Sequence, residues 1–552
     1  MWDPAVTGQV LAALFFVAIL VVLMFGYIVA WTLGGLAVAF GLLGWSLGVF
    51  DLALFQGLAS RFFAVITNPV LIAVPLFVFM GVVLERSKIA EVLLTTMGQM
   101  FGAMRGGLGI SVVVVGALLA ASTGVVGATV VAMGLLALPA MMRAGYDPKL
   151  ATGVICAAGT LGQIIPPSTV LIFVADILQG ANSAAQLAKG NFAPDTVSVG
   201  DLFAGAFIPG VGLAVIYGLW VVVRAAVDPT CAPALVMSAA DRAGLGRRVV
   251  VALIPPLALI VAVLGSIIAG VATPTESASV GSMGALLLAI IKLLADHHFG
   301  GKGPAVLEKK LFNFWLGFIA VIAVVVWLAG AFGLLTMLLV VISLALVPVL
   351  AKKPLRDSFL ETLFESSKGT MTITSMVFVI LLGASAFALV FTRVGGEDLV
   401  RGFLKTMPGG QLGAVMLVMT IMFILGFFLD TFEIIFITVP ITAPILIMMD
   451  VDPILLGVLI GLVLQTSFLT PPFGFSLFYL RGVAPPSITT GMIYRGAVPF
   501  VIMQLLVVGL VWAQPKLATG LPNYFFRQSE AEKKNGAPPP AFNSDQPESD
   551  GG

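Results

Sequence analysis

Long apolar segments recur along the whole chain and alternate with short polar connections. Each segment is near or above the roughly 20 residues that an α-helix needs to cross a bilayer. The segments are residues 10–30, 33–50, 62–84, 110–142, 150–175, 202–223, 249–270, 277–295, 312–350, 368–392, 412–449, 453–480 and 496–514. This pattern predicts an all-α polytopic membrane protein, and we interpret the first segment as a span rather than as a cleaved signal peptide.

The amino-acid composition excludes several classes of function. Of the 552 residues, 59% are hydrophobic and 10% are charged, whereas about 25% of residues are charged in soluble domains. The formal net charge of +1 gives no basic excess for nucleic acid. The two cysteines, Cys156 and Cys231, cannot build a disulfide framework or a cysteine-based metal site. We therefore expect no nucleic-acid partner, no organic cofactor and no enzymatic activity.

Lysine and arginine in the connections orient the chain, because cytoplasmic loops of membrane proteins carry an excess of both. Residues 224–248, 292–310 and 351–361 are rich in Lys and Arg and are assigned to the cytoplasm. Residues 176–201 and the turn at 450–452 are acidic and are assigned to the outside. Since both flanks of the 312–350 segment are then cytoplasmic, this segment is predicted to be a helical pair.

Segments 110–142 and 412–449 are too long for one span and are interrupted near their middles. By the count of Lys and Arg, segment 110–142 enters the membrane from the cytoplasm and returns there, and segment 412–449 does the same from outside. We therefore predict two re-entrant helical hairpins of opposite orientation. A constant offset of 305 residues relates them: Pro139 maps on Pro444, Asp147-Pro148 on Asp452-Pro453, Pro166-Pro167 on Pro471-Pro472, and Phe173 on Phe478. These matches predict an inverted-topology repeat, the architecture of many secondary transporters.

A helix broken at a Pro-Pro pair follows each hairpin, at residues 159–168 and 465–474. Adjacent prolines remove two backbone donors and leave carbonyl oxygens without partners near the bilayer midplane. Such backbone is tolerated in a membrane only where protein, water or a ligand satisfies it. We therefore expect a hard cation such as Na⁺ at these carbonyl and hydroxyl oxygens, and a carboxylate near the N-terminus of a half-helix.

The predicted hairpin tips, residues 122–127 and 426–433, contain small, hydroxyl and acidic residues. Small residues there could equally serve close helix packing. Asp430 and Glu433 indicate function more strongly, because carboxylates inside a membrane are costly. Glu276 lies at a predicted helix start, so capping and a role between the two halves both stay open.

Several short motifs of the chain belong together. They are Thr-Pro-Thr-Glu at 273–276, Gly-Phe-Phe-Leu-Asp at 426–430 leading to Ile-Thr-Val-Pro-Ile at 437–441, Thr-Pro-Pro-Phe-Gly at 470–474, Arg-Gly-Val-Ala-Pro at 481–485, and Gly-Thr-Leu-Gly at 159–162 with Ile-Pro-Pro-Ser at 165–168. Jointly they resemble the large membrane (permease) subunit of tripartite ATP-independent periplasmic (TRAP) transporters, in the ion-transporter superfamily, over residues of about 5–295 and 360–514. The resemblance implies an elevator-type, sodium-coupled importer of organic acid anions in the bacterial inner membrane. It also implies a small four-helix membrane subunit and a periplasmic substrate-binding protein as partners.

By this resemblance, each hairpin tip and the break after it would form one Na⁺ site. The ion-binding residues would be Ser122, Thr123, Gly124, Gly159 and Thr160 in the first site, and Asp430, Thr431, Thr466 and Thr470 in the second. The substrate would lie between the sites, at Pro166, Pro167, Ser168, Pro471, Pro472 and Gly474. Glu276 and Glu433 are further candidates.

Three features depart from the family pattern. The 296–355 insertion is longer than the usual connection, the first tip reads Ser-Thr-Gly in place of Ser-Gly-Ser, and the tail 515–552 is predicted to be disordered.

We divide the chain into first-half scaffold helices and arm (1–105), first hairpin and broken helix (106–180), linking scaffold helices (201–295), the insertion with its helical pair (296–355), second-half scaffold helix and arm (356–410), second hairpin and broken helix (411–482), last helix (488–514) and tail (515–552).

Other functions stay open on the sequence alone. A stand-alone divalent-anion/Na⁺ symporter would need no binding protein, and protons acting through Asp430 or Glu433 could replace sodium. An intramembrane enzyme acting on lipid would need a His, Cys or Asp-rich cluster inside the spans, and the sequence has none there. A channel would need a continuous pore, in which re-entrant loops also occur.

Overall fold

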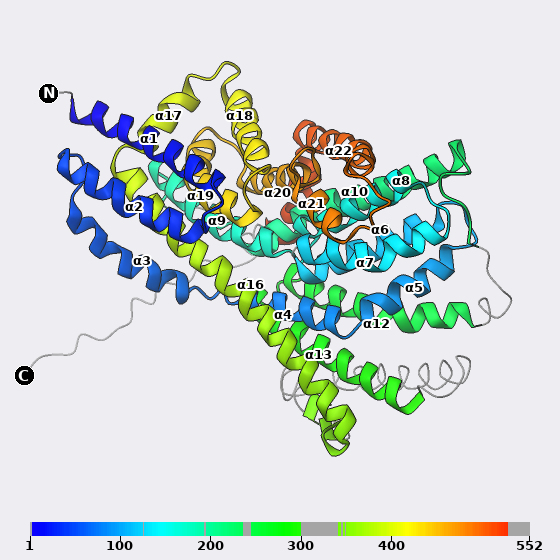
Figure 1. Cartoon of the computed structure of the whole chain (residues 1–552). Helices are drawn as coiled ribbons and strands as arrows, with labels where there is room; N and C mark the ends of the chain where they lie inside the picture. The colour runs from blue at the N-terminus through cyan, green and yellow to red at the C-terminus, as the bar shows by residue number, and fades with distance from the viewer. Residues whose placement is uncertain are drawn as a thin grey trace, which may run out of the picture.

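The computed structural model describes residues 3–124, 126–192, 195–235, 244–299, 341–343, 346–347 and 349–527. Over these residues every regular element is helical (Figure 1). Ten of the described helices are long and apolar enough to cross a bilayer. The prediction of an all-α polytopic membrane protein is therefore confirmed.

The N-terminal helices lie beside one long helix from the second half of the chain. Helix α1 (Pro4–Met24) begins after Asp3, whose side chain accepts a hydrogen bond from the Ala5 amide at 3.1 Å. Helices α2 (Val29–Ser46) and α4 (Ala73–Arg86) both pack against α16, which runs for 41 residues from Lys353 to Arg393 (Figure 1). Shorter helices connect the long ones: η1 (Leu52–Gln56), α3 (Gly57–Ile66), α5 (Ile89–Phe101) and α17 (Gly396–Lys405).

The segment predicted as one span at 62–84 is instead two helices, α3 and α4, because the chain turns at residues 67–72. Asn68 holds this turn: its side-chain oxygen accepts from the Val70 amide at 2.9 Å, and its side-chain nitrogen donates to Asp176 at 2.7 Å. Asp176 lies within α9 (Thr169–Ala188). Its assignment to an external loop is therefore wrong, because the helix continues past it to Ala188.

Two pairs of helices join at the predicted hairpins. The first pair is α6 (Gly107–Thr123) and α7 (Val126–Arg143), and the second is α18 (Gly410–Leu425) and α19 (Thr431–Met448). Shifting both bounds of α7 by the 305-residue offset gives both bounds of α19. The offset found in the sequence thus extends to the ends of helices.

Each hairpin is followed by a helix that breaks at its Pro-Pro pair. In the first half α8 (Pro148–Thr160) leads through the 3-10 turn Leu161–Gln163 and an irregular stretch to α9. In the second half α20 (Pro453–Leu469) is followed by an irregular stretch and α21 (Phe475–Val483). The peptide bonds within both Pro-Pro pairs are cis. Both predicted breaks are present.

The remaining described helices are α10 (Val199–Val227), α12 (Leu245–Ile268), α13 (Pro274–Phe299), α22 (Thr490–Ala513) and α23 (Lys516–Pro522), followed by a π-helical turn at Asn523–Arg527. Disorder was predicted for residues 515–552, and this is wrong for the first part of the tail. Helix α23 packs against α10, with Ala518 and Pro522 buried. Residues 528–552 lie outside the described residues.

The predicted helical pair at 312–350 lies mostly outside the described residues. Of this segment the structure describes residues 341–343, 346–347 and 349–350, all of them helical.

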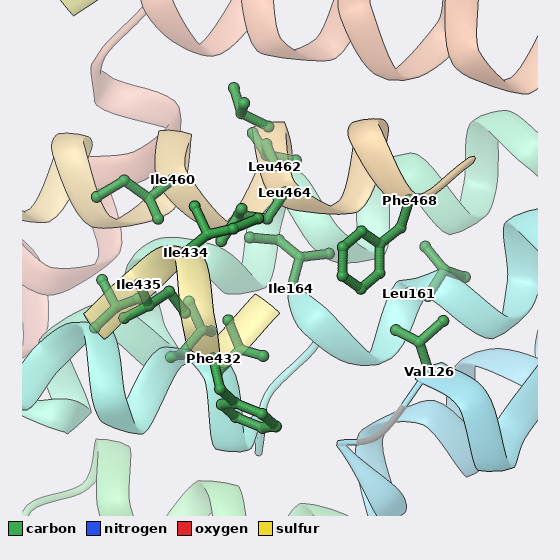
Figure 2. Packing of buried hydrophobic residues seen from close by; sticks show 14 of the residues in the cluster. Val126, Leu161, Ile164, Phe432, Ile434, Ile435, Ile460, Leu462, Leu464 and Phe468 are labelled. Atoms are coloured by element: carbon green, nitrogen blue, oxygen red, sulfur yellow. The ribbon is translucent and has the colours of Figure 1, made fainter. Parts of the chain in front are cut away.

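The core is centred on the two helices that precede the breaks. All residues of α8 from Leu150 to Thr160 are buried, as are all residues of α20 from Ile454 to Leu469. Figure 2 shows buried apolar side chains from both halves of the chain in this cluster, among them Leu161 and Ile164 from the first half and Phe432 and Phe468 from the second. The breaks therefore follow directly on the most deeply buried helices.

Candidate functional site

The first hairpin tip touches the start of the half-helix after the first break. Gly124 ends α6 with φ of 62°, a left-handed conformation that glycine adopts without strain. Its carbonyl oxygen accepts a hydrogen bond from the Thr169 hydroxyl at 3.2 Å. A Cβ at Gly124 would lie 2.7 Å from that hydroxyl oxygen. Ser122 and Thr123 belong to the last turn of α6, but their side chains lie outside the described ones.

The first break is completely buried. Residues 161–170, which include Pro166, Pro167 and Ser168, have no exposed or half-exposed member. The Ser168 hydroxyl donates to the Gln163 carbonyl at 2.9 Å and caps α9 by accepting from the Leu171 amide. The Thr160 hydroxyl donates to the Ala157 carbonyl at 2.9 Å. Gly159 lies against α7, where a Cβ would press on Val130, so this glycine permits close packing.

The second hairpin tip is a capped helix start. Asp430 is the N-cap of α19, and Glu433 stands three residues further on. The Asp430 carboxylate accepts from the Thr431 amide at 2.8 Å. It also accepts from the Glu433 amide, while the Glu433 carboxylate accepts from the Asp430 amide at 3.0 Å, and these two reciprocal bonds make a capping box. Both carboxyl groups thus lie at the N-terminal end of α19, where the helix dipole favours negative charge.

The second break is more open than the first. The Thr466 and Thr470 hydroxyls donate to the Leu462 and Thr466 carbonyls, both at 2.7 Å, so each oxygen keeps its lone pairs. Gly474 is buried, but Pro472 is exposed, and its carbonyl accepts from the Tyr494 hydroxyl at 2.6 Å. The exposed side chain of Phe473 packs beside Phe428 of the second tip, with the two rings tilted to each other and their centroids 5.5 Å apart.

Among the described residues, two hydrogen bonds between side chains join the halves of the chain at the breaks and the second tip. Gln163 of the first break donates through Nε2 to the Thr431 hydroxyl oxygen at 2.7 Å, and both residues are buried. Gln465 of α20 donates through Nε2 to the Thr160 hydroxyl oxygen at 3.4 Å. Thr160 and Gln465 are 305 residues apart, so the second bond links equivalent positions of the repeat. The first break and the second tip are therefore in direct contact.

Sequence reasoning missed three residues of this region: Gln163, Gln465 and Tyr479. Tyr479 of α21 lies against Gly127 of the first hairpin, where a Cβ would be 3.0 Å from its ring, and within electrostatic range of Asp430 and Glu433. The 305-residue offset could have found Gln465, because it falls on the equivalent of Thr160. No pattern in the sequence points to Gln163 or Tyr479.

The residues present fit a cation bound mainly by neutral oxygens. Gln163 Oε1 is buried and has no hydrogen-bond partner, and it belongs to the side chain that contacts Thr431. An orphaned buried oxygen is costly unless a ligand or water satisfies it. The donors at this contact are amide, hydroxyl and carboxylate oxygens, which suit a hard cation rather than a transition metal.

Glu276 does not join this cluster. It lies exposed in the first turn of α13, and its carboxylate accepts from the Thr273 amide at 2.8 Å and from the Thr273 hydroxyl at 2.9 Å. The Glu276 amide in turn donates to that hydroxyl at 3.3 Å. This geometry is a capping box. The neighbouring Thr275 hydroxyl donates to the Pro69 carbonyl at 2.6 Å and ties α13 to the turn before α4.

Comparison with known proteins identifies relatives along most of the chain. A family model described as Tripartite ATP-independent periplasmic transporter, DctM component, matches residues 16–347 and 328–517. The chain is 27% identical over 524 residues to the C4-dicarboxylate TRAP transporter large permease protein DctM of Vibrio cholerae, covering 92% of this chain and 97% of that protein. It is 26% identical over 524 residues to the ectoine/5-hydroxyectoine TRAP transporter large permease protein UehC of Ruegeria pomeroyi, covering 94% and 100%. Among solved structures the YdaH transporter of Alcanivorax borkumensis shares the fold, with a TM-score of 0.50 and 14% identity over 85% of this chain and 90% of that one.

Proposed function

Because the chain belongs to the DctM-component family of tripartite ATP-independent periplasmic transporters, it is a transporter permease, and we propose that it imports an organic acid anion with Na⁺ as the coupling ion. A small four-helix membrane subunit and a periplasmic binding protein that delivers the substrate complete the complex in this proposal. Relatives are named for C4-dicarboxylates and for ectoine, so membership of the family leaves the individual substrate open.

The observation that carries the sodium proposal is the contact between the first break and the second tip. Gln163, Thr431 and Asp430 bring neutral oxygens and one carboxylate to a region that both halves of the chain build, with Gln163 and Thr431 buried. A cation bound there neutralises the carboxylate and satisfies the orphaned Gln163 oxygen. Binding of the ion and the arrangement of the two halves are therefore linked, which is the requirement for coupling.

Uptake by proteoliposomes tests the coupling ion directly. The permease is reconstituted with its small subunit and loaded binding protein, and uptake is followed under an inward Na⁺ gradient, an inward proton gradient, or neither. We expect accumulation only with the Na⁺ gradient. Accumulation driven by the proton gradient alone would make Asp430 and Glu433 proton carriers, and uptake without binding protein would favour a stand-alone symporter.

An elevator movement of the hairpins is the mechanism we propose, and one crevice supports it. A crevice of about 270 Å³ separates α1, α16 and α17 from the second hairpin, and apolar side chains such as Phe16, Phe391 and Ile421 line most of it. Protein interiors are close-packed, so incomplete packing at this boundary suits two bodies that slide past each other.

Reversible cross-linking tests the movement. A thiol-cleavable linker between Phe16→Cys of α1 and Ile421→Cys of α18 bridges the crevice, and both native cysteines are buried and do not compete. We expect this linker to stop uptake and a reductant to restore it. The control pair is Phe16→Cys with Phe391→Cys, two positions within the scaffold whose rings are 6.4 Å apart. Unchanged uptake with the first pair linked would exclude the elevator.

A further inference from the structure

A cationic hollow lies at one end of helices α8, α10 and α22, away from the candidate ion sites. Its volume is about 240 Å³, and its lining includes Asp147, Lys149, Trp220, Arg224, Arg495 and Pro499. Lys149 stands in the first turn of α8, Arg224 in the last turn of α10, and Arg495 in the second turn of α22. Three helix ends that are distant in the sequence thus bring three cations around one space.

The hollow carries an excess of positive charge. Asp147 is the only carboxylate in its lining, and that group already accepts the Lys149 amide at 3.0 Å as the N-cap of α8. Among the described residues no salt bridge within 4.0 Å involves Lys149, Arg224 or Arg495. Two guanidinium groups, each with a planar fork of donors, therefore remain available to an anion.

The repeat offers an internal comparison, because the equivalent place in the second half is filled by protein. The 305-residue offset carries Lys149 onto Ile454 at the start of α20. Each of these residues lies against a glycine of a neighbouring helix: a Cβ at Gly496 would press on the Lys149 carbonyl, and one at Gly205 would lie 2.9 Å from Ile454. Ala518 of α23 also covers the second glycine, since its carbonyl oxygen would lie 2.7 Å from a Cβ at Gly205. One hollow is closed by apolar protein, and the other is open and cationic.

The depth of the open hollow in the membrane indicates which ligand fills it. Arg224 begins the connection that the excess of Lys and Arg assigns to the cytoplasm, and Trp220 lies one turn earlier in α10. Tryptophan is enriched at the level of lipid headgroups. The cytoplasmic leaflet is anionic and attracts basic residues beside it, and basic pockets between spanning helices bind phosphate-bearing headgroups.

We propose that this hollow binds the phosphate headgroup of an anionic phospholipid from the cytoplasmic leaflet. Arg224 and Arg495 bind the phosphate oxygens, Lys149 adds charge, and Trp220 packs beside the lipid at the interface. The lipid takes the place that α23 fills in the second half, and it holds α8 against α22 at the end opposite to the first break. This inference does not depend on the coupling ion or the substrate.

Lipid binding to the purified full chain, followed by native mass spectrometry in detergent, tests the proposal. We expect retained phosphatidylglycerol adducts and few adducts of phosphatidylcholine. Arg224→Gln and Arg495→Gln should each weaken phosphatidylglycerol binding about five-fold, as expected for one cation near an anionic surface, and the double variant should weaken it about twenty-fold. The matched control is Lys516→Gln, a cation at the start of α23 on the filled side, which should leave the affinity unchanged.

Two results would overturn the proposal. Equal loss in Lys516→Gln would show that general surface charge rather than this hollow binds the lipid. Inorganic phosphate could raise the thermal midpoint of unfolding fully, with no further rise when phosphatidylglycerol is added. That result would show a site for a soluble anion in place of a lipid site. Thermal unfolding in mixed micelles of detergent and phosphatidylcholine is the check on folding: the thermal midpoints of the variants should match that of the parent there, and diverge only when phosphatidylglycerol is added.

Discussion

The hydrogen bond between Gln163 and Thr431 allows a role in folding to be separated from a role in transport. Thr431→Val removes the acceptor and leaves both polar atoms of the buried Gln163 amide unpaired, since Gln163 Oε1 has no partner. This should cost about 1–3 kcal/mol of unfolding free energy. Gln163→Leu also removes the unpaired Gln163 oxygen but leaves the buried Thr431 hydroxyl without its partner, so its cost should be smaller, about 1 kcal/mol.

The double variant Gln163→Leu/Thr431→Val replaces the polar pair by an apolar one. The repeat shows that this is a reasonable replacement, because the equivalent positions carry Phe468 and Val126, which are both buried in the same apolar cluster (Figure 2). We therefore expect the double variant to unfold within about 1 kcal/mol of the parent. The double variant should therefore be more stable than Thr431→Val alone.

The double variant should regain stability but not transport if the Thr431 hydroxyl and the Gln163 side-chain carbonyl bind Na⁺. Sodium-driven uptake should fall about ten-fold or more in Thr431→Val and in the double variant, which corresponds to about 1.4 kcal/mol. The rise in thermal midpoint that NaCl gives over choline chloride should also disappear. The control is Thr438→Val in the same helix, whose hydroxyl donates to the Ile434 carbonyl within α19. A double variant with parental uptake and parental stabilisation by sodium would refute the assignment, and one that stays unstable would refute the apolar comparison.

Three further variants test other parts of the structure. Gly124→Ala should lower the unfolding free energy by at least about 1 kcal/mol, because φ there is 62° and the new Cβ would meet the Thr169 hydroxyl; thermal unfolding in detergent measures this. Gly496→Ala should cost about 1–3 kcal/mol more than Gly509→Ala in the same helix, because a Cβ at 496 would press on the backbone of α8 while nothing lies within 4 Å at 509; equal thermal midpoints would contradict this. Asp430→Asn should keep the helix cap, since Asn and Asp cap alike, yet reduce sodium-driven uptake about ten-fold; parental uptake would remove the carboxylate from the ion site.

The apolar pattern predicted the spanning helices because their length is set by the bilayer and can be counted along the chain. It missed α5 and α17 and merged α3 with α4, because a helix of 10 to 14 residues is too short for that criterion. The prediction of disorder for the tail was wrong for a different reason. Its composition is that of a disordered segment, but Ala518 and Pro522 of α23 are buried against α10, and such docking depends on a partner surface far away in the sequence.

The candidate site was predictable where the repeat determines it. The Pro-Pro pairs and the interrupted apolar segments indicated both breaks and both tips, and the offset related the two sets to each other. The offset could also have paired Thr160 with Gln465, since these equivalent residues meet where the two halves face each other. The contact of Gln163 with Thr431 was not predictable, because those residues are 268 apart and follow no offset. Their meeting depends on how the second hairpin lies across the first break, which only the packed structure determines.

The repeat separates residues that build the fold from residues that give the two halves different tasks. Positions with the same residue in both halves, such as the Asp147 and Asp452 caps and the two Pro-Pro pairs, start the core helices and break them. Three of the positions that differ are ones where ligands are proposed: Gln163 against Phe468, Thr431 against Val126, and Lys149 against Ile454. In each case one half has a polar group and the other an apolar one in the equivalent place, so the fold does not require the polar group. Joint exchange of Gln163 and Thr431, or exchange of Lys149, for the apolar equivalents should therefore reduce ion or lipid binding more than it reduces stability, and exchange at the shared positions should do the reverse.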